Sequence, residues 1–408
     1  MTECKAQQVV ITGYDQVSSL GRSLAEFDSA LWSGHADAEA YNIELPGLEP
    51  ACVPICRSSI DISKLIAPSK VPMDRGTALA LFVAMQASTS AGLDSTIDRE
   101  RLGVFWGSGM AGAHTFDMSA HAIYAQHNRI RPTNVVSAMP NAPGAEIALW
   151  SKAKGMSLSY ACACASSAAA IGEAMHAIRN GRLDVAIVGG SESMLTPGVI
   201  ASWQAMRVLA QVQDNPKQAC RPFDLHRTGF ALGEGAAALI LESHDHALKR
   251  RAQILARLSG YGTSSDGMHI TNPDPQGQMR AMRMALNDAK LQPSDIGYIN
   301  AHGTATKAGD LAESNSIGEV FQGLSVPVSS TKGLHGHLLG AGGAVELVVT
   351  LRALHHQRLP VSANLTEHDP AIALNLVNAD ASYPVPLRHV MSNSFAFGGT
   401  NVVLIASI

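Results

Sequence analysis

The segment Ser157–Gly190, SLSYACACASSAAAIGEAMHAIRNGRLDVAIVGG, contains the patterns that decide the fold. The run Met156–Ala161 predicts a strand, and the small-residue stretch Ala165–Asn180 predicts a helix that Gly181 ends. The apolar run Leu183–Gly189 then predicts a second, buried strand. Strands that alternate with helices are typical of mixed α/β proteins, in which helices cover the sheets.

The rest of the chain continues this alternation without a low-complexity segment or a long linker. The best candidate boundary lies near Lys249–Ala256, which predicts a first half over residues 1–252 and a second over 253–408. Further strands are expected at Val9–Thr12, Gly103–Gly107, Gly235–Glu242, Gly297–Ala301, Val326–Ser330, Val390–Ser394 and Thr400–Ala406, and further helices at Arg75–Ser90, Asp310–Phe321 and Gly343–Leu354.

Composition excludes several classes of protein. Of the 408 residues, 46% are hydrophobic and 16% are charged, which rules out a disordered chain. The 30 basic against 34 acidic residues leave no basic excess for nucleic-acid binding. No apolar run is long enough to span a membrane, and the start MTECKAQQVVITG does not resemble a signal peptide, so we expect a cytoplasmic protein. The low charge favours a buried subunit interface over the alternative of a compact monomer.

The six cysteines are too sparse for a disulfide framework in a chain of this length. Cys52 and Cys56 have no second pair at zinc spacing, and His335 and His337 have no carboxylate or cysteine near them in sequence. We therefore expect no metal site. No G-x-G-x-x-G follows a strand and opens a helix, and no Walker A motif occurs, so no dinucleotide or nucleotide site is expected.

Cys164 stands where the predicted strand gives way to the Ala-rich helix. The unsatisfied N–H groups of a helix N-terminus lower a thiol pKa and favour the nucleophilic thiolate. The small neighbours Ala163, Ala165 and Ser166 leave room for an acyl group. A cysteine in such surroundings can equally be a packed core residue, and spacing alone does not choose between Cys164 and Cys162.

A nucleophilic thiol needs partner groups, and the second half offers three segments that carry them. His302 follows a predicted strand in NAHGTATKAGDLAE, and Lys332, His335 and His337 lie in the glycine-rich STKGLHGHLLGAGG. In NSFAFGGTN, the glycines after Phe397 make a tight turn whose N–H groups could complete an oxyanion hole. With 16 histidines in the chain, any one of them alone is a weak signal, and the turn alone could be an ordinary hairpin.

Taken in this order, these blocks closely resemble the β-ketoacyl-acyl carrier protein synthases, the elongating ketosynthases of the thiolase-like superfamily. The resemblance covers nearly the whole chain and includes CRPFDLHRTGFALGEGAAALIL. It implies a five-layer αβαβα sandwich of two similar halves and no cofactor. It also implies decarboxylative Claisen condensation of a Cys-bound acyl group with malonyl-acyl carrier protein, in fatty acid or in specialised polyketide or polyene synthesis.

The resemblance also assigns roles to residues. It makes Cys164 the nucleophile, with Cys162 as a neighbour, and it makes His302, His337 and Lys332 the catalytic partners, with Glu346 supporting the lysine. Phe397 and Gly398 match the family's gate and oxyanion turn, Thr304 and Thr306 match threonines that hold the pantetheine arm, and Met110 matches a residue lining the acyl channel. Arg129, Arg131 and Arg221 are candidates for docking the carrier protein.

Several positions depart from the family pattern. Tyr14, Asp15, His335 and Ala396 replace smaller or different residues, and the segment VPMDRG places Val71 and Pro72 where a basic docking helix often carries charges. These differences suit a specialised pathway as well as housekeeping fatty-acid synthesis.

The resemblance implies a homodimer, or a heterodimer with a chain-length-factor-like subunit. One alternative is that this chain is itself such a non-catalytic partner, but those usually lack the cysteine. A second alternative, a degradative thiolase, needs another cysteine near NSFAFGGTN, which has none.

Overall fold

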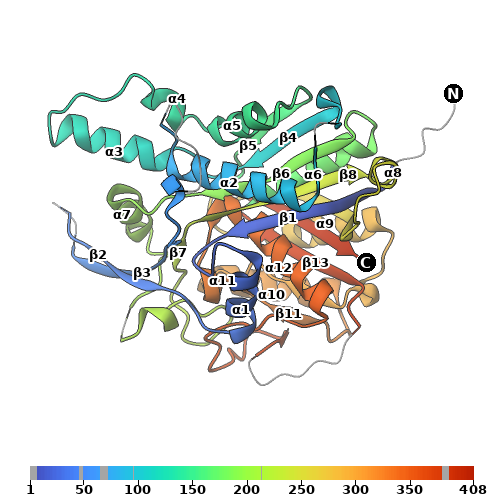
Figure 1. The fold of residues 1–408 in the computed structure, drawn as a ribbon. Coiled ribbons are helices and arrows are strands. Elements are labelled where there is room, and N and C mark those ends of the chain that lie inside the picture. Colours follow the sequence, from blue (N-terminus) through green and yellow to red (C-terminus); the bar gives the residue numbers. More distant parts are fainter. Residues whose placement is uncertain (1–6, 46–48, 65–71, 95, 213, 379–385) are drawn as a thin grey trace.

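The computed structural model describes residues 7–45, 49–64, 72–94, 96–212, 214–378 and 386–408 (Figure 1). Among them, the strands form one sheet of eleven strands and a separate sheet of three. No helix in this part of the chain is long and apolar enough to cross a membrane.

The large sheet consists of two halves with the same topology. The first half has the order β1-β8-β6-β4-β5 and the second β9-β14-β13-β10-β11, with β12 at its edge. In each half, the first two pairs of neighbouring strands in that order are antiparallel, and the next two pairs are parallel. The halves join where β1 pairs with β9. The strands are β1 (Val9–Val17), β4 (Leu102–Gly107), β5 (Ser157–Tyr160), β6 (Val185–Glu192), β8 (Gly235–Ser243), β9 (Ala256–Ser265), β10 (Tyr298–Asn300), β11 (Pro327–Ser329), β12 (Asn375–Leu376), β13 (His389–Phe395) and β14 (Thr400–Ser407).

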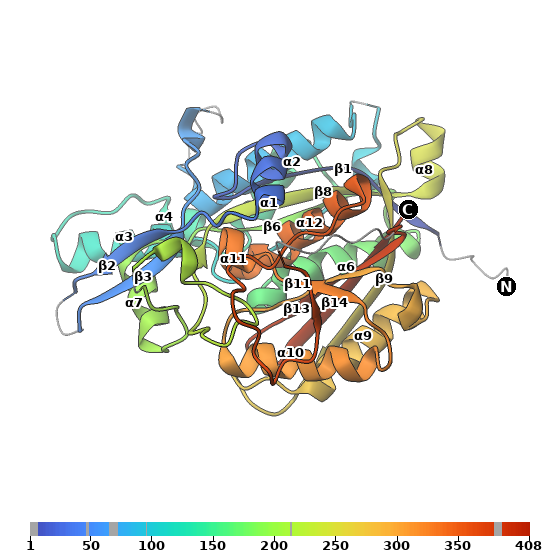
Figure 2. The same cartoon turned by 90° about the horizontal axis from the view of Figure 1, so that it is seen from below.

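Helices cover both outer faces and fill the space between the halves, which gives the five layers that the resemblance implies (Figure 2). The helices α2 (Arg75–Ser90) and α5 (Ala142–Ser151) cover the first half, and α9 (Pro275–Ala289) and α10 (Lys307–Val320) cover the second. Between them lie α6 (Ser166–Arg179) and α12 (Gly342–His356). The two inner helices pack so closely that a Cβ on Gly343 would lie 2.8 Å from the Cβ of Ala168. Small residues are therefore required where these helices meet.

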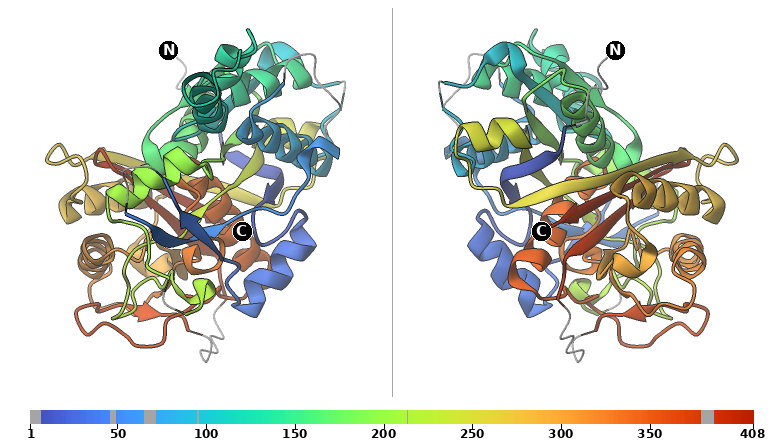
Figure 3. Two further views of the ribbon diagram at one scale, coloured as in Figure 1. Left: turned by 90° about the vertical axis from the view of Figure 1, so that its left-hand side faces the viewer. Right: turned by 90° about the vertical axis from the view of Figure 1, so that its right-hand side faces the viewer.

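Most of the remaining elements lie around this body, several of them on one side (Figure 3), whereas α11 (Lys332–His335) is buried within it. The others are α1 (Leu24–Ser33), β2 (Glu39–Ile43), β3 (Ala51–Cys56), α3 (Ala113–Tyr124), α4 (Asn134–Ala138), α7 (Pro197–Ala205), β7 (Leu232–Gly233) and α8 (His244–Lys249). Large apolar side chains are exposed on α3, α4, α5 and β5, and we call this set the apolar face: Phe116, Met118, Ile123, Tyr124, Val135, Val136, Leu149, Trp150 and Leu158.

The strands and helices expected from the sequence are present, most with ends shifted by one to three residues. The largest shift is in the strand expected at Val9–Thr12, which continues to Val17, and the strand expected at Leu183–Gly189 runs from Val185 to Glu192. The sequence analysis did not identify β9, α9 or the β2-β3-β7 sheet. The division at residue 252 stays a prediction, and it falls in the connection between α8 and β9.

Candidate active site

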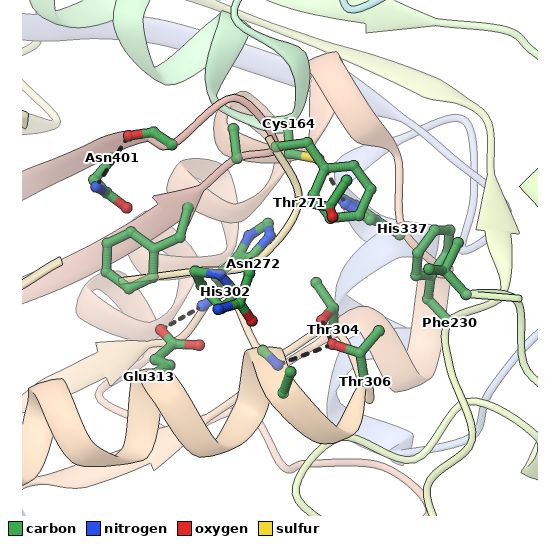
Figure 4. A pocket seen from close by; sticks show the side chains of 18 of the residues that line it. Cys164, Phe230, Thr271, Asn272, His302, Thr304, Thr306, Glu313, His337 and Asn401 are labelled. Atoms are coloured by element: carbon green, nitrogen blue, oxygen red, sulfur yellow. Dashed lines mark hydrogen bonds between the residues drawn. The ribbon is translucent and has the colours of Figure 1, made fainter. Parts of the chain in front are cut away.

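Cys164 lies in a single 3-10 turn, Ala163–Ala165, that connects β5 to the N-terminus of α6 (Figure 4). Ala163 has the left-handed φ of 48°, a strained conformation for alanine. Ser166 stabilises the turn, since its hydroxyl donates to the Ala163 carbonyl at 2.6 Å and accepts from the Cys162 N–H at 2.9 Å. This turn directs the Cys164 thiol into a pocket that Cys162 does not line.

The charge state of Cys164 differs from the sequence-based expectation. Burial raises the pKa of its thiol to about 12, although Lys332 and the backbone N–H of Phe397 act in the opposite direction. The prediction that the helix N-terminus lowers the thiol pKa and favours the thiolate is therefore wrong, because the loss of hydration outweighs the groups that favour the anion. The Cys164 thiol is therefore protonated at neutral pH.

His337 is the direct neighbour of the thiol, with its Nε2 3.1 Å from Sγ. Its other ring nitrogen, Nδ1, accepts the backbone N–H of Leu339 at 3.2 Å. A neutral imidazole carries one proton, so this contact places the proton on Nε2. Backbone bonds hold the residue in place, because its N–H donates to Ala231 and its carbonyl accepts from Gly233.

His302 lies two residues after the end of β10 and faces His337, with ring centroids 5.3 Å apart and ring planes at 81°. Glu313 on α10 fixes its backbone by accepting the N–H groups of His302 at 2.8 Å and Gly303 at 2.7 Å. Burial, and then the positive charge of Lys332, lower the pKa of both His302 and His337 well below the usual value for histidine. Both rings are therefore neutral hydrogen-bond donors at physiological pH.

One ligand atom each from Cys164, His302 and His337 lies within 4.8 Å of the others, close enough to surround a metal ion. Metal binding requires an unprotonated nitrogen, whereas the Leu339 N–H leaves the proton on the His337 Nε2 that faces the thiol. The arrangement fits hydrogen-bond donation toward a substrate better than it fits metal coordination.

Lys332 and Glu346 form a fully buried ion pair behind these residues. Burial raises the pKa of the Glu346 carboxyl to about 7, and Lys332 opposes this shift. Lys332 does not line the pocket, so it acts on the histidines through its charge rather than by contact with a substrate.

The turn after β13 carries Phe397, whose N–H faces the Cys164 sulfur and whose ring stacks on Trp203 with centroids 6.2 Å apart. Gly398 and Gly399 have φ values of 85° and 76°, which only glycine adopts readily. The Gly398 N–H donates to the Ile270 carbonyl at 2.7 Å, so it is not available to an oxyanion. Phe397 therefore contributes the free N–H of this turn.

A pocket of about 330 Å³ is lined by Cys164, His302, His337 and Phe397. It also includes Thr304 and Thr306, whose hydroxyl oxygens are 3.0 Å apart. The sequence analysis missed Trp203, Phe230, Thr271 and Asn272, four further lining residues. The sequence does not distinguish aromatic residues that line a pocket from those of the core, because Trp203 and Phe230 also pack against the core.

Other candidates from the sequence lie outside the pocket. Met110 is 48% exposed beside the apolar face, and Arg129 and Arg131 are exposed after α3. Arg221 donates to the carbonyl of Gln218 at 2.8 and 3.0 Å. Pro72 is exposed, and Val71 lies outside the described residues.

Comparison with known proteins gives two family matches. Residues 63–247 match the model "Beta-ketoacyl synthase, N-terminal domain", and residues 255–366 match "Beta-ketoacyl synthase, C-terminal domain".

Among curated proteins, the chain is 36% identical over 412 residues to nodulation protein E of Rhizobium leguminosarum bv. trifolii, covering 98% of each chain. It is 35% identical over 416 residues to 3-oxoacyl-[acyl-carrier-protein] synthase 2 of Staphylococcus aureus, again covering 98% of each. Among solved structures, a type II polyketide acyl-carrier protein in complex with its ketosynthase bound to a hexaketide superimposes with a TM-score of 0.89. The identity is 30%, and the match covers 98% of this chain and 99% of the other.

Proposed function

The chain belongs to the β-ketoacyl synthase family, and we propose that Cys164, His302 and His337 carry out its condensation of an acyl group with malonyl-acyl carrier protein. The 3.1 Å contact between the Cys164 Sγ and the protonated Nε2 of His337 is the observation that carries this assignment. It brings a nucleophile and a hydrogen-bond donor together in one buried pocket from positions 173 residues apart.

In the first half-reaction, Cys164 attacks the carbonyl of an acyl thioester. A bond forms between Sγ and the carbonyl carbon, the bond from that carbon to the carrier sulfur breaks, and the thiol proton leaves with the carrier thiol. The backbone N–H groups of Cys164 and Phe397 stabilise the tetrahedral oxyanion, since neither donates to a carbonyl among the described residues.

In the second half-reaction, the malonyl carboxylate leaves as CO₂, and its electron pair forms the enolate of the thioester. The donor on the His337 Nε2, with His302 beside it, stabilises the oxygen of that enolate. The carbanion attacks the acyl carbon, and Cys164 leaves as a thiolate that takes a proton from solvent. Neutral histidines suit this step, because they donate a hydrogen bond without protonating the carbanion.

The entrance and surface fit a carrier-bound substrate. Thr304 and Thr306 offer hydroxyls along the pocket to the amides of a pantetheine arm. We propose that Arg129, Arg131 and Arg221 contribute to docking an acidic carrier protein. The apolar face, with Met110 beside it, is the surface we propose for a dimer, with a second copy or with a chain-length-factor-like subunit.

The non-catalytic alternative is not favoured, because Cys164, His302 and His337 are all present and lie together. A degradative thiolase is disfavoured because the turn after β13 carries Phe397 and glycines where a second cysteine would be needed.

The test is incubation of the purified protein with a panel of acyl-acyl carrier proteins and malonyl-acyl carrier protein, with and without candidate partner subunits. Mass spectrometry should find an acyl adduct on Cys164 and a β-ketoacyl product two carbons longer. An adduct on another residue, or a product formed equally well by Cys164→Ala, would contradict the assignment.

A further inference from the structure

Glu192, the last residue of β6, has a buried carboxylate that the mechanism above does not use. Its Oε1 accepts the Ser108 hydroxyl at 3.0 Å and the Met110 N–H at 3.3 Å. Its Oε2 accepts the Gly109 N–H at 2.6 Å and the Gly340 N–H at 3.1 Å. All four donors are uncharged, so hydrogen bonds alone stabilise this carboxylate.

The four donors belong to two turns that come from different halves of the fold. Ser108–Met110 follows β4 in the first half, and Gly340 lies in the 3-10 turn Leu339–Ala341 that precedes α12 in the second. The turns are in contact, because a Cβ on Gly340 would lie 2.1 Å from the Gly109 nitrogen. Glu192 therefore joins the backbone beside the apolar face to the backbone beside the pocket.

The second of these turns controls a reacting group. Leu339, next to Gly340, has a strained φ of 46°, and its N–H is the donor that leaves the proton on the Nε2 of His337. A strained residue keeps its conformation only where its surroundings hold it, and the Glu192 contact with Gly340 does so.

We propose that Glu192 is a positioning residue for the condensation, because it holds the Leu339–Gly340 turn in the conformation that keeps the His337 proton facing the substrate. This proposal rests on the proposed function. Burial raises the pKa of the Glu192 carboxyl to about 7, so keeping this group ionised inside the protein costs free energy. A carboxylate kept at such a cost is typical of functional sites, which supports the proposal. The charge of Glu192 also opposes ionisation of Cys164, so the group is not there to activate the thiol.

Two variants test the proposal. Glu192→Leu removes every acceptor, while Glu192→Gln keeps one oxygen and leaves its amide N–H₂ facing backbone donors in either orientation. Glu242→Leu is the matched control, because Glu242 is also a buried carboxylate, on the neighbouring strand β8, but its partners are Thr12, His246 and Arg250. Each protein is assayed for malonyl-acyl carrier protein decarboxylation, for acyl loading, and for alkylation of each cysteine by iodoacetamide.

We expect decarboxylation to fall about 100-fold in Glu192→Leu, the lower end of the range for a lost transition-state donor. The fall should be smaller, about 10-fold, in Glu192→Gln, which keeps one acceptor oxygen. Alkylation of Cys164 should become faster than in the unchanged protein, because a nearby negative charge is gone and His337 is free to accept the thiol proton. Cys56 and Cys220, both buried, should stay protected, and Glu242→Leu should change neither rate by more than threefold.

Opposite changes in decarboxylation and Cys164 alkylation do not arise from a loosened fold, which would expose Cys56 and Cys220 as well. Decarboxylation within threefold of the unchanged protein, or a Cys164 alkylation rate that falls, would overturn the role of Glu192. If Glu192→Leu does not fold, the rates of decarboxylation and of Cys164 alkylation in Glu192→Gln test the proposal instead. If the unchanged protein loads no acyl group and decarboxylates no malonyl group, the proposed function fails, while the alkylation rates still report on Glu192.

Discussion

Replacing Lys332 by methionine should destabilise the protein in a pH-dependent way. The side chains of Lys332 and Glu346 are both almost fully buried, so the substitution leaves a carboxylate in the core with no counter-charge. Removing one partner of a buried pair typically costs about 3–5 kcal/mol. The carboxyl group can limit this cost by taking up a proton.

The cost of that proton follows from the pKa of the group. A glutamate in the unfolded chain titrates near 4.5, and each pH unit above that value costs about 1.36 kcal/mol for protonation. At pH 7 the neutral form therefore costs about 3.4 kcal/mol, and at pH 4.5 it costs less than about 1 kcal/mol. The pKa of Glu346 in the folded variant is raised above its unfolded value, so stability is lost as pH rises from about 4.5.

The assay is urea denaturation of the unchanged protein, Lys332→Met and the double variant Lys332→Met/Glu346→Gln at pH 5 and pH 7.5. Lys332→Met should lose little at pH 5 and at most about 4 kcal/mol at pH 7.5, because the raised pKa of Glu346 means that the unchanged protein already bears part of this cost, and the double variant should recover most of the loss. The double variant should nevertheless remain slow, because without the lysine charge the pKa values of Cys164, His302 and His337 rise. An equal loss of stability at both pH values, or recovery of full activity in the double variant, would refute this reasoning.

Three further predictions concern the pocket. Cys164→Ala or Cys164→Ser should abolish acyl loading and Cys162→Ala should retain it, as read by mass spectrometry of the intact protein, and an adduct on Cys162 would contradict this. His302→Ala and His337→Ala should each slow malonyl decarboxylation by about 10²–10³ and acyl loading by much less, whereas equal losses in both half-reactions would count against their roles. Because burial lowers the pKa of both histidines well below 6.5, NMR titration of the two imidazole rings from pH 8 to pH 5.5 should show no protonation; a ring of His302 or His337 that titrates with a midpoint near 6.5 would indicate a solvated imidazole.

Elements with strong local patterns could be predicted from the sequence. The apolar strand β6 is buried along its whole length and the Ala-rich α6 along most of it, and their composition indicates this directly. The strand β9 was missed because its sequence, ARLSGYGTSS, is rich in glycine and serine. Its glycines are needed for packing, since a Cβ on Gly262 would lie 2.1 Å from the Ala281 carbonyl of α9. A tertiary requirement of this kind has no local signal.

The charge states of the site residues also could not be predicted from the sequence. The position of Cys164 before a helix predicted a reactive thiolate, but local sequence contains no measure of burial, which dominates the thiol pKa. Spacing likewise could not separate Cys164 from Cys162. The left-handed Ala163 between them does so, by turning one side chain into the pocket and leaving the other outside it.

The repeated topology explains why the reacting groups meet where they do. Counted along the chain, β5 is the third strand that the first half contributes to the large sheet, and Cys164 follows it. Likewise, β11 is the third such strand of the second half, and Lys332 follows it. Each of these segments leads into one of the two inner helices, α6 and α12, which pack against each other. The equivalent loops of the two halves therefore meet at the centre of the molecule. One of them carries Cys164, and the other carries Lys332 and His337, so neither half alone contains both the thiol and the donor that the proposed chemistry requires.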